Sequence, residues 1–114
     1  MKNQRIIKKN HQFQIIINHN QTKLNPTFVL YYEAPNDNKG LHYGISVGKK
    51  LGNAVCRNKI KRQVRMMIQT LLKNYAALNI EVIIMVRKRY QSQNYQKNLQ
   101  ELEKLFNRIA LEVK

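Results

Sequence analysis

Apolar residues recur every three or four positions in three segments of the chain, and this spacing predicts three amphipathic helices. A short helix is expected to begin at Asn10, and a last helix to follow a cap at Ser92 or Asn94, because Asn and Ser side chains accept bonds from free first-turn amides. The longest helix covers residues 54–74. Its core stripe is expected to be Ile60, Val64, Met67, Ile68 and Leu71.

Three further segments have the pattern of strands. Residues 27–33 and 42–47 alternate between two sets of side chains, and residues 34–40 (APNDNKG) between them have the composition of a turn. Because these two strands are close in sequence, we expect them to pair as an antiparallel hairpin. Residues 81–87 (EVIIMVR) are apolar on both faces, which predicts an inner strand covered on both sides. A short extra strand is expected near Thr22.

The order of these elements predicts an α+β fold in one domain, residues 1–114. Its architecture is expected to be a two-layer sandwich, in which helices pack on a small mixed sheet. The first nine residues are basic and polar, so we expect residues 1–9 to form a flexible arm.

The distribution of charge narrows the class of partner. The chain has 114 residues and a formal net charge of +15. Residues 48–65 (GKKLGNAVCRNKIKRQVR) hold seven basic residues, and no acid lies between Asp37 and Glu81. A general bias of the sequence towards Lys and Asn would not explain why one particular stretch has no acidic residues. A polyanion is therefore the expected partner, and nucleic acid is the first hypothesis.

Helical spacing places the basic residues around the long helix. At about 100° per residue, Arg57 points the same way as the core stripe but one turn before it. We therefore expect it to overhang the edge of the sheet; the alternative is that its stem lies on apolar surface and its head reaches water. Around the helix axis, Lys61 and Arg65 come next after Arg57. Asn58 and Arg62 lie further around on the same side.

Two aromatic residues are candidate platforms for unpaired bases. Tyr31 would offer one if it lies on the exposed face of the sheet, because stacking on a ring tolerates any base. Phe13 would offer a second, although an aromatic residue at helical spacing is more often part of the core.

Other chemistries find little support. Residues 44–50 (GISVGKK) depart from the P-loop pattern, and Cys56 and the three His residues lack metal-ligand spacing, so we expect no metal site. A nucleophile made of Cys56 and a His has no other support, and the basic stretch lacks the carboxylates of two-metal hydrolysis. We expect no catalytic residue in the protein.

The single Cys and the lack of a membrane span or secretory signal favour the cytoplasm. The basic stretch also has no Trp or Phe to insert into a membrane surface.

The stretch KLGNAVCRNKIKRQVR resembles the signature of the bacterial ribonuclease P protein component, and KKNHQF, TFVLYY and GISVGKKLGNAV extend the similarity. The resemblance implies the small protein cofactor of a ribonucleoprotein endonuclease, a hydrolase for which no further protein partner is required. Its large RNA, with bound Mg²⁺ held mainly by that RNA, removes the 5′ leader of precursor tRNA; the protein alone requires no cofactor. It also implies a left-handed βαβ crossover, where general rules favour a right-handed one.

The resemblance also implies two sets of binding residues. The cleft for the single-stranded leader is expected to hold Phe13 and Tyr31, with Arg57 at its margin. Two residues depart from the family pattern: Lys59 replaces an Arg and loses its planar fork, and Ile17 stands where many members carry a second aromatic ring. The residues expected to bind the catalytic RNA are Lys50, Asn53, Arg57, Asn58, Lys59, Lys61, Arg62 and Arg65.

Two alternatives remain open at this point. The same charge and aromatic residues suit a free-standing module that binds single-stranded or ribosomal RNA. An enzyme in its own right would rest only on Cys56 and the scattered His residues.

Overall fold

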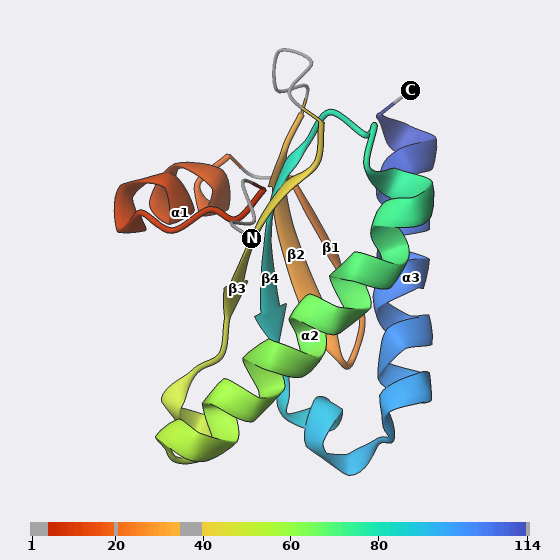
Figure 1. Cartoon of the computed structure of the whole chain (residues 1–114). Helices are drawn as coiled ribbons and strands as arrows, with labels where there is room; N and C mark the ends of the chain where they lie inside the picture. Colours follow the sequence, from red (N-terminus) through yellow and green to blue (C-terminus); the bar gives the residue numbers. More distant parts are fainter. Residues whose placement is uncertain (1–4, 20, 35–39, 114) are drawn as a thin grey trace.

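The computed structural model describes residues 5–19, 21–34 and 40–113 (Figure 1). The elements in chain order are α1 (Asn10–Ile17), β1 (Thr22–Leu24), β2 (Phe28–Glu33), β3 (His42–Ser46), η1 (Lys49–Leu51), α2 (Ala54–Tyr75), β4 (Glu81–Val86), η2 (Lys88–Ser92) and α3 (Tyr95–Glu112). The predicted helices and strands are confirmed, including the short strand near Thr22. Residues 35–39 of the expected turn lie outside the described residues.

The four strands form one mixed sheet in the order β1-β2-β4-β3. The predicted hairpin of β2 and β3 is wrong, because β4 lies between them, antiparallel to β2 and parallel to β3. The physical reason is burial. Val82, Ile83 and Ile84 of β4 are fully buried, so this strand needs a neighbour on each side and a cover on each face. A β2–β3 hairpin would have displaced it to an edge.

The connection from β3 through α2 to β4 is left-handed, as the resemblance implied. In Figure 1, β3 and β4 both run downwards, α2 passes in front of the sheet, and β4 lies to the right of β3. A path that descends behind, rises in front and moves to the right turns as a left-handed screw. This connection is one of the few exceptions to the right-handed rule for parallel strands.

The helices cover both faces of the sheet unequally. α2 and α3 pack on the face that carries Leu30 and Ile84, and all five residues of the predicted α2 stripe are buried there. α1 covers part of the opposite face, where Ile16 packs with Ile7 and Ile83. The architecture is a mixed α+β fold in which the main core lies between the sheet and the pair α2 and α3.

The N-terminal segment is part of the fold from Arg5 onwards. The Ile7 amide donates to the Tyr43 carbonyl at 2.7 Å, and the Tyr43 amide donates to the Arg5 carbonyl at 2.8 Å. The expectation of a flexible arm is therefore wrong for Arg5–Ile7, while residues 1–4 lie outside the described part. The reason is that β3 is an edge strand, whose outer backbone groups accept a further segment.

Side chains cap two of the three helices. The Asn53 side chain accepts from the Cys56 amide at the start of α2, and the Asn94 side chain accepts from the Lys97 amide at the start of α3. Asn94 is thus the cap, rather than Ser92. The predicted cap at Asn10 is wrong, because Lys9 occupies the cap position of α1 and makes no capping bond with its side chain.

Candidate nucleic-acid interface

Among the α-helices of the protein, the positive charge is greatest on α2. α2 carries six basic residues and no acid, whereas α3 carries three basic and three acidic residues. Both helices pack on the same face of the sheet, so the difference lies in their solvent-facing sides. The surface formed by α2 is therefore the one that attracts a polyanion.

The start of α2 adds backbone groups to this charge. Gly52 has a φ of 133°, in the region that favours glycine, and an added Cβ would stand 3.0 Å from the Cys56 side chain. This sharp turn brings the exposed Lys50 of η1 next to the first turn of α2, which contains no acid. The positive end of the helix dipole and its free amides favour a phosphate there.

Most of the predicted RNA-binding side chains are open to solvent. Arg57 and Lys61 are half-buried, and the Nε atom of Arg57 is shielded from water and has no hydrogen-bond partner among the described residues. Part of the Arg57 guanidinium group is thus shielded by the protein, so its head does not reach water as freely as the alternative interpretation expected. The exposed members of the set are Lys50, Asn53, Asn58, Lys59, Arg62 and Arg65.

A groove of about 220 Å³ lies where α1, β3 and α2 meet. Phe13 lines it from α1, Ile45 from the edge strand, and Lys61 and Arg65 from α2. The ring of Phe13 and the cations of Lys61 and Arg65 thus face one concave space, and rings beside cations are the combination that binds a single strand of nucleic acid. Its remaining lining residues are Ile6, Ile7, Lys8 and Tyr43.

The structure places the three predicted cleft residues differently from one another. Tyr31 is half-buried and pairs across strands with Ile83, which in turn pairs with Gly44, and the ring of Phe13 lies over Gly44. Phe13 and Tyr31 therefore share a face of the sheet, with Ile83 between them. Arg57 does not line the groove; Lys61 and Arg65 do.

Sequence reasoning missed the N-terminal wall of this groove and the role of Gly44. The two adjacent isoleucines at positions 6 and 7 could have indicated it, because a solvent-exposed basic arm gains nothing from apolar side chains. A glycine inside an alternating strand was another, since it marks a place where something approaches the backbone closely.

Metal sites and membrane-spanning helices are both missing from the described residues. Among these residues, no group of three or more His, Cys, Asp or Glu side chains is placed to hold a metal ion. In the same part of the chain, the helices are too short or too polar to cross a membrane.

The fold and its charged helix define a small α+β protein that presents a basic surface beside an aromatic groove. Comparison with known sequences gives the particular family. The family model described as Ribonuclease P matches residues 1–110, and the chain belongs to this family as its protein component.

Individual relatives agree with this assignment. The ribonuclease P protein component of Mesoplasma florum is 50% identical over 109 residues, which cover 96% of this chain and 98% of that protein. The one from Mycoplasma capricolum is 46% identical over the full length of both. The solved Staphylococcus aureus RNase P protein is 33% identical, with a TM-score of 0.81 over 98% of this chain and 100% of that one.

Proposed function

We propose that this chain binds the catalytic RNA of ribonuclease P through the basic surface of α2. The observation that carries the proposal is that α2 holds six basic residues and no acid on a helix whose apolar stripe is fully used in the core. Arg forks bind phosphate oxygens in pairs and Lys adds point charge. The contact surface consists of Lys50, Asn53, Arg57, Asn58, Lys59, Lys61, Arg62 and Arg65.

The leader of precursor tRNA is the second ligand. Phe13 and Tyr31 offer aromatic surface on the α1 side of the sheet, and Arg57 was expected at the margin of this cleft. The groove beside Phe13 adds Lys61 and Arg65, whose charges suit the phosphates of a strand that leaves the ring. An unpaired leader fits this surface better than a duplex, because stacking needs an open base face.

Hydrolysis is assigned to the RNA subunit, with Mg²⁺ held mainly by that RNA. The support from this chain is the absence of any acid between Asp37 and Glu81, together with the lack of a metal-holding group of side chains among the described residues. The protein then acts as a non-catalytic subunit in the cytoplasm, needs no cofactor of its own and no protein partner, and raises the affinity of the RNA for its substrate.

Reconstitution tests this function. The purified protein is expected to be inactive alone and to promote cleavage of the 5′ leader from precursor tRNA by the catalytic RNA at low Mg²⁺. Binding of single-stranded RNA without any stimulation of cleavage would favour the free-standing RNA-binding module instead. Cleavage of the leader by the protein alone would revive the enzyme hypothesis.

A further inference from the structure

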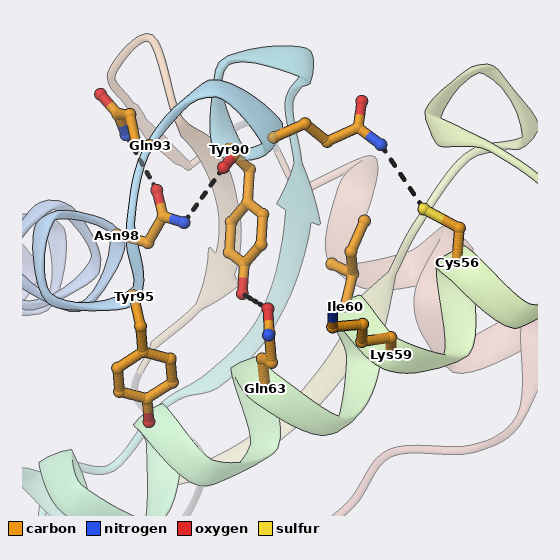
Figure 2. A pocket seen from close by; sticks show the side chains of 9 residues that line it. Cys56, Lys59, Ile60, Gln63, Tyr90, Gln93, Tyr95 and Asn98 are labelled. Atoms are coloured by element: carbon orange, nitrogen blue, oxygen red, sulfur yellow. Dashed lines mark hydrogen bonds between the residues drawn. The ribbon is translucent and has the colours of Figure 1, made fainter.

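A second hollow lies on the opposite flank of α2, between that helix and the segment from η2 to the start of α3 (Figure 2). It has a volume of about 350 Å³, within the range of small-molecule sites. It shares no lining residue with the groove beside Phe13. Its polar lining is mostly amide and phenol groups, and none of its lining residues is acidic. The lining residues are Cys56, Lys59, Ile60, Gln63, Tyr90, Gln91, Gln93, Tyr95 and Asn98.

The wall of this pocket is fixed by a chain of hydrogen bonds. The Gln93 amide donates to the Asn98 side-chain oxygen at 2.8 Å, and Asn98 donates to the Tyr90 carbonyl at 3.1 Å. The Tyr90 hydroxyl then donates to the Gln63 side-chain oxygen at 2.7 Å (Figure 2). Tyr90 is buried, which raises the pKa of its phenol and keeps it a donor. The pocket is therefore preorganised by groups from three elements.

These bonds leave particular groups for a ligand. Gln63 lines the pocket and its side-chain oxygen is occupied, while its two amide N–H groups have no partner among the described residues. The amide nitrogen of Gln93 is used by Thr27 and Asn98, and its side-chain oxygen is directed away from Gln63 (Figure 2). The N–H donors of Gln63 match the acceptor atoms at the edge of a nucleobase.

The remaining walls supply a ring and positive charge. Tyr95 is half-buried at the start of α3, so part of its ring is open, and Lys59 lines the α2 side. Gln91 lies between this pocket and a neighbouring hollow of about 460 Å³. Lys88 and Arg89 line that hollow, and both are exposed. A pocket lined by aromatic and amide side chains thus lies next to a hollow lined by cations. The base and the phosphate of a nucleotide are adjacent in the same way.

We propose that the pocket receives one unpaired nucleobase, which Gln63 binds at its edge and Tyr95 at its face, while Lys88 and Arg89 bind the attached phosphate. The ligand is a nucleoside monophosphate unit, either free or within an RNA strand. The proposal goes beyond the proposed function, and its test needs neither the catalytic RNA nor precursor tRNA.

The test is a titration of the full chain with the four nucleoside 5′-monophosphates, followed by NMR of the side-chain amides of Gln63, Gln93 and Asn98. Ribose 5-phosphate, which has the same phosphate and no base, is the control ligand. Saturable shifts are expected with at least one nucleotide, at a Kd on the order of 1 mM for one stacked base. Ribose 5-phosphate is expected to leave these three side-chain amides almost unshifted. Equal shifts with and without the base, or none at all, would overturn the proposal.

Two pairs of variants assign the contacts. Gln63→Glu keeps an acceptor for the Tyr90 hydroxyl but removes the amide donors, and it should weaken nucleotide binding about tenfold or more. Gln69→Glu makes the same charge change at an exposed position of α2 and should leave binding unchanged. Tyr95→Leu, which removes the ring, should weaken binding about five- to a hundredfold, whereas Tyr95→Phe, which keeps it, should not.

A short single strand identifies the source of the ligand. Uridine 5′-monophosphate is compared with a single-stranded oligouridylate, both followed at Gln63. Tighter binding of the strand at this residue assigns the pocket to RNA. Binding of the monophosphate alone assigns it to a free nucleotide. If neither shifts Gln63, and the other three nucleotides also fail, the nucleobase site is wrong while the RNA-binding role of α2 stands.

Discussion

The ring of Phe13 lies directly on the backbone of Gly44. A Cβ added to Gly44 would stand 2.6 Å from Cζ of Phe13 and 3.0 Å from Cδ1 of Ile83. Both distances are at or below the limit of real contacts, so no side chain fits at this position without displacing its neighbours. A residue from α1 is thereby seated on strand β3, and the aromatic wall of the groove depends on a glycine.

Gly44→Ala is therefore expected to displace Phe13 and to cost about 1–3 kcal/mol of stability from overpacking. Affinity for precursor tRNA should fall, while affinity for mature tRNA should hardly change. Gly48→Ala is the matched control, because a Cβ at Gly48 meets nothing within 4 Å. Thermal unfolding and binding assays on both variants check the prediction, and equal behaviour of the two would contradict it.

Tyr31→Ala is expected to weaken binding of a precursor with a leader by about 1–3 kcal/mol, the range for loss of one stacked base. Mature tRNA lacks the leader and should bind almost as before. Tyr31 also packs beside Ile7, Ile16 and Ile83, so the stability of the variant is measured in parallel. Equal losses for precursor and mature tRNA would show that Tyr31 acts only through the core.

Arg62→Ala is expected to weaken binding to the catalytic RNA and to reduce the slope of log K against log salt by about 1, since one phosphate contact is lost. Arg108→Ala is the control, because Arg108 is exposed on α3, where acidic residues balance the basic ones. Binding measured over a series of salt concentrations gives both slopes. An unchanged slope for Arg62→Ala would place this residue outside the interface.

Asn53 has two roles that substitutions can separate. Asn53→Ala removes the cap of α2 and should cost about 1 kcal/mol of stability. Asn53→Asp keeps a capping oxygen and adds a favourable charge at the helix start, so its stability should match or exceed that of the parent chain. Its carboxylate would nevertheless repel a phosphate. Thermal unfolding is thus expected to show that Asn53→Asp is more stable than Asn53→Ala. An RNA-binding assay should show weaker RNA binding by Asn53→Asp. Full RNA affinity for Asn53→Asp would exclude a phosphate at this end of α2.

The end of α3 is tied to the sheet by an acid-sensitive contact. Glu112 pairs with Lys23 of β1 and accepts a hydrogen bond from the Tyr32 hydroxyl at 3.0 Å. The bond from Lys23, and then that from Tyr32, lowers the pKa of Glu112 from its ordinary 4.5. A lowered pKa means that the stabilisation is present above pH 4.5 and is lost as the pH falls through the lowered value.

Glu112→Gln should therefore lower the midpoint of thermal unfolding at neutral pH, and the difference from the parent chain should close in acid. At the alkaline end the contact weakens as Lys23 loses its proton, above its ordinary pKa of 10.5, because the bond to Glu112 raises that pKa. Glu103→Gln, at an exposed position of the same helix, is the control. A pH-independent difference for Glu112→Gln would show that the ion pair does not stabilise the fold.

Local patterns carried most of the secondary structure. The stripe from Ile60 to Leu71 and the cap at Asn94 were both readable, because each depends on residues three or four positions apart. Pairing of β2 with β3 was predicted wrongly because closeness in sequence was given more weight than the two apolar faces of residues 81–87. The segment at Arg5–Ile7 was missed since its partner, Tyr43, lies far along the chain.

The sequence by itself determined that this protein is a basic α+β chain of the ribonuclease P family, with its positive charge greatest on one helix. Those properties depend on composition and on short-range spacing, which a single chain displays directly. Only the tertiary structure decided that β4 separates β2 from β3, that Phe13 rests on Gly44, and that Tyr90 donates a hydrogen bond to Gln63 beside a second pocket. Each of these contacts joins segments distant in sequence, so burial and close packing in three dimensions selected them.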